Sequence, residues 1–283
     1  MNGLLRTLAI RPAVLTLLMA VALLAGAPIA QAWWAPEPGS QWQWQLSGQK
    51  IDTTINVPVY DLDADSTPAS VVKALHAKGR KVVCYIDAGS WESYRSDRRA
   101  YAPSLLGRRV GGWPAERWVD IRRLDGPAGP TGRTLRQILT ARIDRCRAKR
   151  FDAVEPDWMD SYVQPTGFAI STAQQLRFNR FLARTAHARG LGVALKNDKE
   201  QTRALAGDFD FGIDEECQHW HECLGRGVKG DPGWAPFIAA GKAVLNAEYT
   251  DQTGSCTQPR GLSSILKHRN LGSWRRQCPV RLR

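Results

Sequence analysis

Ionisable side chains stand at the ends of most β-rich runs in this 283-residue sequence. They are Asp61 or Asp63, Asp87, Glu155 and Asp157, Lys196, Asp214 with Glu215 and Glu216, and Glu248. If the runs are parallel strands of one barrel, their carboxyl ends meet at one mouth. A single acidic residue there usually caps a loop or pairs with an arginine. Because several like charges raise one another's energy, a whole ring of them indicates a binding or catalytic site.

Two chemistries use such a ring of carboxylates. One is the binding of Mg²⁺ or Ca²⁺, and the other is glycoside hydrolysis by a carboxylic acid and a carboxylate on opposite sides of the scissile bond. Aromatic residues close to these acids could stack on pyranose faces: Tyr60, Tyr85, Trp91, Trp158, Trp220 and Tyr249. Aromatic rings beside carboxylates favour a sugar over a metal ion. We therefore predict a carbohydrate site with no metal and no cofactor.

The elements that must position these residues alternate along the chain. Eight β-rich runs begin near Trp42, Val57, Lys81, Phe151, Gly192, Phe209, Ala243 and Asn270. Eight β-α steps in about 250 residues is the size of a single (β/α)₈ barrel. A doubly wound open sheet has the same units, but no Gly-rich phosphate loop opens any of the helices. We predict an α/β fold of the TIM-barrel type in one domain.

Three helices carry their own signals. Apolar residues at helical spacing from Leu135 to Cys146 predict one buried stripe. Ser171 with Gln174 reads as a capping box, and Thr67-Pro68 predicts the start of another helix. Residues 91–130 differ, because they are rich in Arg, Gly and Pro. We expect this segment to be a long excursion over the active-site face.

The N-terminal segment has the pattern of an export signal. Arg6 and Arg11 precede an apolar run from Ala13 to Leu24, and small residues follow at Ala30-Gln31-Ala32. The run is shorter than the roughly 20 apolar residues that a membrane span needs. We predict a signal peptide at residues 1–32, a mature hydrolase domain at 33–283, no membrane span, and a secreted or periplasmic location.

Six cysteines in an exported protein predict disulfide bonds, since thiols pair in oxidising compartments. Proximity in sequence favours Cys217 with Cys223 and Cys256 with Cys278, which leaves Cys84 for Cys146. The segment Cys217-x-His-x-His-x-Cys223 also has a metal-like spacing. Zinc is the weaker hypothesis, because a disulfide between these two cysteines would leave no thiolate for a metal ion.

The net charge of +12 indicates an anionic neighbour or a solvated basic surface. Removal of residues 1–32 with their two arginines leaves +10. No nucleic-acid motif accompanies the charge, so we predict no specific nucleic-acid partner, and we expect a monomer.

The sequence resembles the endo-α-1,4-polygalactosaminidase family, glycoside hydrolase family 114. Five segments carry the resemblance in the family's order: VCYIDAGSWE from Val83, FDAVEPDWMDSY from Phe151, GVALKND from Gly192, DEECQHWHEC from Asp214, and PFIAAGKAVLNAEY from Pro236. The resemblance implies a secreted endo-acting hydrolase of α-1,4-linked galactosamine-containing polysaccharide. It implies a retaining mechanism with Asp157 as nucleophile and Glu215 as general acid/base. Trp158 and Glu216 depart from the family's usual EPDN and NEQC, so altered sugar contacts are expected there.

Without the resemblance, the residues themselves do not single out Asp157 and Glu215 among the acidic candidates. Strand alternation puts Glu155 and Asp157 on one face and Asp214 and Glu216 on one face, so Glu215 would need a bulge to join its neighbours. Glu248 is the third candidate for contact with substrate. Further predicted substrate-binding residues are Asp87, Tyr85, Asp61, Glu155, Lys196, Trp158 and Tyr249. Two alternative functions stay open: a barrel that binds polysaccharide without cutting it, and a basic secreted protein that binds an anionic polymer.

Overall fold

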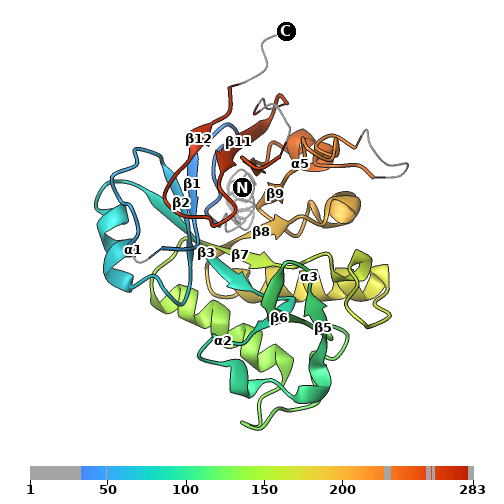
Figure 1. Cartoon of the computed structure of the whole chain (residues 1–283). Coiled ribbons are helices and arrows are strands. Elements are labelled where there is room, and N and C mark those ends of the chain that lie inside the picture. The colour runs from blue at the N-terminus through green and yellow to red at the C-terminus, as the bar shows by residue number, and fades with distance from the viewer. Residues whose placement is uncertain (1–32, 49, 226–230, 253–255, 257–258, 280–283) are drawn as a thin grey trace, which may run out of the picture. The chain divides into compact units, whose positions relative to one another are not determined.

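A nine-stranded sheet forms the centre of the computed structural model, which describes residues 33–48, 50–225, 231–252, 256 and 259–279 (Figure 1). The predicted signal peptide lies outside these residues. Eight strands pair in parallel in the order β1 (Trp42–Gln45), β2 (Val59–Asp63), β3 (Lys81–Asp87), β7 (Ala153–Asp157), β8 (Gly192–Lys196), β9 (Phe211–Glu215), β10 (Val244–Tyr249) and β11 (Leu262–Lys267). A two-residue strand, β12 (Arg276–Gln277), adds antiparallel to β11.

Side chains join the two ends of the parallel run. The Trp42 indole donates a hydrogen bond to the Ser263 carbonyl at 2.9 Å, and the Lys267 ammonium donates to Gln43 Oε1 at 3.2 Å. These contacts bring β1 next to β11, so the sheet curls back on itself. The predicted TIM-like barrel is confirmed.

Helices cover the outside of the sheet. They are α1 (Ala69–His76), α2 (Leu135–Ala148), α3 (Thr172–His187), α4 (Thr202–Leu205) and α5 (Ala235–Ala239). Both long helices begin with a capping box, Thr134 with Gln137 in α2 and the predicted Ser171 with Gln174 in α3. Within the described part of the chain, no α-helix follows β1 or β10. The repeat is therefore less regular than eight β-α steps.

The eighth strand was predicted in the wrong place. It is β11, at Leu262–Lys267, whereas Asn270 lies in a turn. All six residues of β11 are buried, although three of them are Ser or Lys. Their polar composition hid the strand, because a fully buried strand normally reads as an apolar run.

Two separate hydrophobic clusters show which side of each strand faces the barrel interior. Trp42, Val59, Val83, Ala153 and Ile213 belong to a cluster inside the barrel. Leu62, Cys84, Val154, Val193 and Val244 belong to a larger cluster under the helices. Side chains alternate between the two, as the two-residue period of a strand requires.

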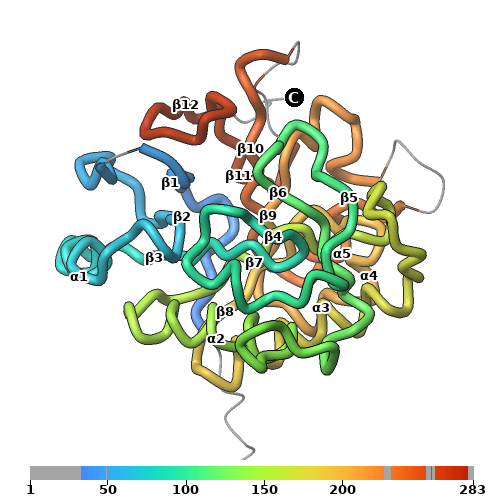
Figure 2. Tube along the Cα trace, turned by 60° about the horizontal axis from the view of Figure 1, so that its bottom comes forward, coloured from blue at the N-terminus to red at the C-terminus, as the bar shows by residue number. Residues whose placement is uncertain are grey.

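The predicted excursion contains a small antiparallel sheet. Its strands are β4 (Ser90–Glu92), β5 (Leu106–Val110) and β6 (Trp113–Val119), in the order β4-β6-β5. Trp113 of β6 and Asp157 at the end of β7 line the same cleft, so this sheet lies over the carboxyl ends of the barrel strands (Figure 2).

Three disulfides have the predicted connectivity: Cys84–Cys146, Cys217–Cys223 and Cys256–Cys278. The first ties β3 to α2 across the barrel wall. The second uses both cysteines of the metal-like segment, which excludes the zinc reading. No helix among the described residues is long and apolar enough to span a membrane.

The burial of Lys267 in β11 should make the stability of the protein depend on pH. Its side chain is fully buried with neutral partners, and burial lowers its pKa to about 7. The unfolded chain keeps this proton up to about pH 10, so stability should rise with pH above 7. We expect the free energy of unfolding of the native protein to gain about 2 kcal/mol between pH 7 and pH 9 relative to Lys267→Met. Urea unfolding at both pH values measures this difference, and parallel pH profiles would contradict it.

Candidate active site

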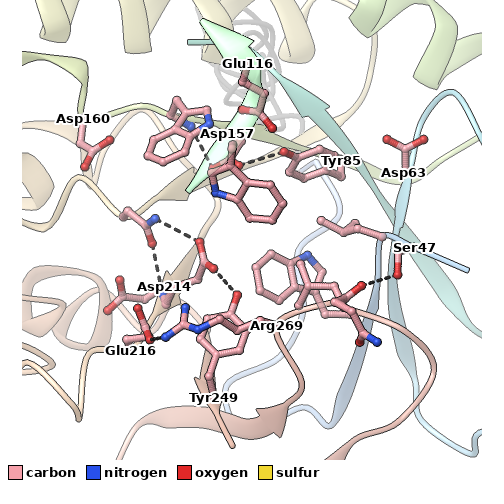
Figure 3. A pocket seen from close by; sticks show the side chains of 18 of the residues that line it. Ser47, Asp63, Tyr85, Glu116, Asp157, Asp160, Asp214, Glu216, Tyr249 and Arg269 are labelled. Atoms are coloured by element: carbon pink, nitrogen blue, oxygen red, sulfur yellow. Dashed lines mark hydrogen bonds and ion pairs between the residues drawn. The ribbon is translucent and has the colours of Figure 1, made fainter. Parts of the chain in front are cut away.

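A cleft of about 620 Å³ opens at the carboxyl ends of the strands, between the barrel and the small sheet (Figure 3). Nine carboxylate residues line it: Asp63, Glu92, Glu116, Asp157, Asp160, Asp214, Glu215, Glu216 and Glu222. Its lining includes three cationic residues, Arg95, Lys199 and Arg269. Seven aromatic residues complete the wall, namely Trp44, Tyr85, Tyr94, Trp113, Trp158, Trp220 and Tyr249. The cleft is strongly acidic in a protein with a large basic excess.

Lys196 connects the two principal carboxylates from below. Its ammonium nitrogen lies 2.8 Å from Asp157 Oδ1 and 3.0 Å from Glu215 Oε2. Because both oxygens lie so close to one nitrogen, they are at most 5.8 Å apart. Lys196 is fully buried, and these carboxylates raise its pKa well above the ordinary value. The lysine therefore stays charged and fixes the spacing of the pair.

Each of these carboxylates also accepts a hydrogen bond from a tyrosine. Tyr85 donates to Asp157 Oδ2 at 2.9 Å, and Tyr249 donates to Glu215 Oε1. Burial first, and then the adjacent carboxylate, raise the pKa of both tyrosines, so both remain donors at neutral pH. Asp157 is more enclosed, with a side chain 14% exposed against 25% for Glu215.

A second pair of carboxyl groups lies deeper in the barrel. Glu155 accepts from the Trp44 indole at 3.1 Å and lies 3.3 Å from the Lys196 nitrogen. Asp61 is fully buried beside Glu155. Burial, and next the charge of Glu155, raise the pKa of Asp61 well above the ordinary range. Asp61 is therefore the protonated member, and Glu155 is the third carboxylate around Lys196.

Three neighbouring strands end in the same unusual way. Asp157, Lys196 and Glu215 are the last residues of β7, β8 and β9. The next residues, Trp158, Asn197 and Glu216, have φ values of 57°, 57° and 63°. Residues with a Cβ rarely adopt this left-handed conformation, which costs about 1 kcal/mol or more. Each of these residues turns the chain sharply away from its strand. The side chains just before the turns, those of Asp157, Lys196 and Glu215, therefore lie together at the bottom of the cleft.

Glu215 faces the barrel interior without a bulge. It alternates in phase with Phe211 and Ile213, which both belong to the interior cluster. Asp214 faces the other way and accepts from the Trp234 indole at 2.8 Å. The expectation that Glu215 needed a bulge was wrong, because Glu215 already stands in phase with the interior residues of β9.

Other predicted site residues do not reach the cleft. Glu248 lies on the outer side of β10, where it accepts hydrogen bonds from the backbone N–H of Gln218 at 2.9 Å and from Asn246 Nδ2 at 2.9 Å. Asp87 is buried under β4, and both of its oxygens accept hydrogen bonds from Ser90. Their contacts are with the protein itself, and neither lines the cleft.

Asp87 nevertheless belongs to a buried acidic cluster that reaches the cleft wall. Asp87, Glu92 and Glu116 have carboxylate oxygens within 4.8 Å of one another. Arg95 and Ser90 donate to members of this cluster. Burial and then Glu92 raise the pKa of Glu116 to about 7. Glu116 is thus a cleft carboxylate that changes charge near neutral pH.

The model of glycoside-hydrolase family GH114 matches residues 24–283. The chain belongs to family GH114. An Aspergillus fumigatus structure described as Ega3 in complex with galactosamine is 30% identical, with a TM-score of 0.76. That match covers 87% of this chain and 97% of the Aspergillus chain. The glycoside hydrolase domain of PelA from Pseudomonas aeruginosa is 16% identical and has a TM-score of 0.56, over 86% of this chain and all of that domain. The second likeness supports the fold alone. No curated protein matches the sequence significantly.

Several cleft residues of this GH114 enzyme were missed by sequence analysis. Trp44, Asn197 and Arg269 line the cleft, and so do Tyr94, Arg95, Trp113 and Glu116 from the excursion. Trp44 could have been found by alternation, because it follows the inward Trp42 by two residues. The excursion residues carry no periodic signal, since their placement depends on a register-shifted pairing of β5 with β6.

Proposed function

We propose that this GH114 chain is an exported, endo-acting, retaining hydrolase of α-1,4-linked galactosamine-containing polysaccharide. Asp157 is the nucleophile and Glu215 the general acid/base. The observation that carries this assignment is the placement of both carboxylates within 3.0 Å of one buried lysine nitrogen. Retaining enzymes separate their carboxyl groups by about 5–5.5 Å, whereas inverting enzymes need about 6.5–9.5 Å. The upper bound of 5.8 Å between Asp157 Oδ1 and Glu215 Oε2 lies below the inverting range and supports retention.

The environment of each carboxylate matches its proposed role. Asp157 accepts hydrogen bonds from Tyr85, from Lys196 and from the backbone N–H of Trp158 at 2.9 Å. These donors hold the carboxylate in one orientation for attack on the anomeric carbon. Glu215 is the more exposed of the two and stands where a leaving oxygen and then a water can reach it. It would protonate the leaving oxygen first and deprotonate the water in the second step.

The charge of the cleft supports an amino sugar as substrate. Nine acidic residues against three cationic ones give the cleft a negative potential that favours an ammonium group over a neutral sugar. The net charge of +12 lies largely outside it, and charges beyond about 8–10 Å are screened at physiological salt. Trp113 and Trp220 are about half exposed at the rim, where pyranose faces could stack on them. The likeness to the galactosamine-bound Aspergillus structure supports the same substrate.

Export is supported by the three disulfides, which form in oxidising compartments. The N-terminal pattern that ends at Ala32 supports cleavage there. The intact mass of the exported protein should correspond to a chain that begins at Trp33.

The test of the proposed function is cleavage of defined polymers. Partly deacetylated galactosaminogalactan should yield oligosaccharides of intermediate length, detected by mass spectrometry, because an endo-acting enzyme cuts within the chain. Fully N-acetylated polymer and a neutral galactan serve as controls and should be cut much more slowly. Binding of the polymer without any release of oligosaccharides would instead support a carbohydrate-binding barrel.

Glu116 should make substrate binding depend on pH. Its carboxyl ionises as pH rises through its raised pKa of about 7, so the cleft gains negative charge from the acidic to the alkaline side of that value. For a substrate that remains cationic, KM should therefore fall about three-fold over this range. In Glu116→Gln the amide cannot ionise, so this fall in KM should become clearly smaller while kcat changes little. The remaining fall would come from Asp160 and Asp214, which also line the cleft and whose pKa values burial raises to about 6 and about 7. Steady-state kinetics at several pH values measure both, and an unchanged KM profile in the variant would refute the assignment.

A further inference from the structure

A second hollow, of about 590 Å³, lies on the outside of the barrel and shares no lining residue with the acidic cleft. It is bounded by the loop 122–127, the start of α2 and the outer face of α3. The helices α2 and α3 pack against each other (Figure 1). Five arginines line it: Arg122, Arg123, Arg136, Arg177 and Arg184. Asp125 is the one acidic residue in this lining.

The loop that forms one wall is firmly attached. Arg136 forms a two-bonded ion pair with Asp125, and its backbone N–H donates to the Leu124 carbonyl at 2.8 Å. The Arg136 guanidinium also stacks over the Phe181 ring at 4.6 Å. These contacts neutralise the single acid of the hollow and tie the loop to both helices. Arg122 is likewise paired, with Asp120.

Three arginines are left to bind a ligand. Arg123, Arg177 and Arg184 are exposed, and none has an ion-pair partner among the described residues. All three line the same hollow from two elements, the loop 122–127 and α3. Guanidinium groups bind carboxylates through two parallel hydrogen bonds, and several in one hollow favour a ligand with repeated negative charges.

We propose that this arginine hollow, formed by Arg122, Arg123, Arg136, Arg177 and Arg184, binds an acidic polysaccharide that carries carboxylate groups. Single-stranded nucleic acids depend on exposed aromatic rings for base stacking, and membrane surfaces on exposed apolar side chains. None of the large exposed hydrophobic residues of the described chain lines the hollow, and Phe181 is buried beneath Arg136. A concave site also fits a slender glycan chain better than the convex surface of a DNA duplex.

This site would separate two tasks on one molecule. The acidic cleft takes a cationic glycan, while the arginine hollow holds the enzyme on an anionic polymer in the same surroundings. The two sites have opposite charge and lie on different elements, so both can be occupied at once. The inference does not depend on the proposed hydrolytic function.

Titration of the purified protein with polygalacturonate oligosaccharides tests the proposal. We expect binding that weakens steeply between about 50 and 300 mM NaCl, because exposed charges are screened by salt. Saturating galactosamine, the ligand proposed for the cleft, should not compete. The combined variant Arg123→Gln/Arg177→Gln/Arg184→Gln should bind about ten-fold more weakly at low salt, as expected for the loss of three exposed ion pairs.

The matched control removes the same charge elsewhere. Arg99, Arg147 and Arg203 are exposed and lie outside the hollow, and their combined substitution by Gln should leave the affinity within about two-fold. Equal weakening in both triple variants would overturn the proposal in favour of diffuse surface charge. Tighter binding of duplex DNA, single-stranded DNA or phosphatidylglycerol vesicles that is lost in the hollow variant would also overturn the choice of a carboxylated glycan. Both triple variants should retain hydrolysis of short substrates.

Discussion

Asp157→Asn should lower kcat on partly deacetylated galactosaminogalactan by about 10⁴-fold or more, because the amide cannot attack the anomeric carbon. The amide oxygen that replaces the carboxylate can still accept a hydrogen bond from Tyr85 or Lys196, so the fold and polymer binding should persist. Glu215→Gln should lose about 10²–10⁴-fold through the missing proton donor. A substrate with a good leaving group should recover the first step of Glu215→Gln, since that step then needs no acid. Initial rates with both substrate types measure these effects.

Added azide separates the two proposed roles. In Asp157→Gly, azide would enter the space of the lost nucleophile and give the β-glycosyl azide. In Glu215→Ala, azide would attack the glycosyl-enzyme from the other face and give the α-glycosyl azide. Nuclear magnetic resonance distinguishes the two products. The opposite assignment of products would exchange the roles, and the absence of either azide would remove the covalent mechanism.

Glu248→Gln is the matched control for these variants. Glu248 is a carboxylate at the end of the adjoining strand, but it accepts hydrogen bonds from the backbone of Gln218 and lies outside the cleft. Its amide replacement can still accept from that backbone. We expect kcat within about three-fold of the native enzyme. A loss of kcat as large as that of Glu215→Gln would show instead that Glu248 takes part in catalysis.

Many of the site residues can be predicted from the alternation of side chains along each strand, once it is known which side of the strand faces the barrel interior. In β7, β9 and β10 the interior residues Ala153, Ile213 and Ala247 each stand two or four positions before a cleft residue. Counting in twos from them gives Asp157, Glu215 and Tyr249. The sequence alone could not choose between the two faces, because both sides of a strand in a barrel with helices outside are apolar. That ambiguity caused the error about Glu215 and the expectation that Glu248 contacts substrate.

The rest of the fold was predictable where local signals are strong. The capping box at Ser171 and the apolar stripe from Leu135 predicted α3 and α2, because helix signals depend on neighbours within one turn. The strand β11 and the excursion sheet depend on contacts between residues far apart in sequence. Ser263 and Lys267 contact β1, whose residues lie 221 and 224 positions earlier in the chain. Composition within β11 therefore gave no sign of its burial.

Lys196→Met should destabilise the protein by about 3–5 kcal/mol and reduce kcat by at least about 10²-fold. The substitution leaves Glu155, Asp157 and Glu215 together without their shared cation. The raised pKa of Lys196 means that its contribution to stability is complete below about pH 10 and is lost only as pH rises through the folded-state pKa. The full loss should thus be visible in urea unfolding at about pH 7.

Lys267→Met provides the matched control for this loss. Lys267 is also fully buried, but its partners are the neutral oxygens of Gln43 and Gly272. The same substitution therefore leaves no uncompensated carboxylate and should cost far less stability. If both variants lost equal stability, the effect would come from packing of the methionine and not from the three carboxylates.

The remaining step is to separate the electrostatic role of Lys196 from its positioning role. In Lys196→Met the pKa of Glu155 should rise further, because burial raises it already and the lysine that lowers it is gone. A raised folded-state pKa of an acid favours folding at low pH, so the stability difference from the native protein should shrink between about pH 7 and pH 5. The double variant Lys196→Met/Glu155→Gln should regain stability at neutral pH but no activity, since Asp157 and Glu215 would still lack the nitrogen that fixes their spacing. Recovery of activity in the double variant would show that charge balance alone, and not spacing, is what Lys196 supplies.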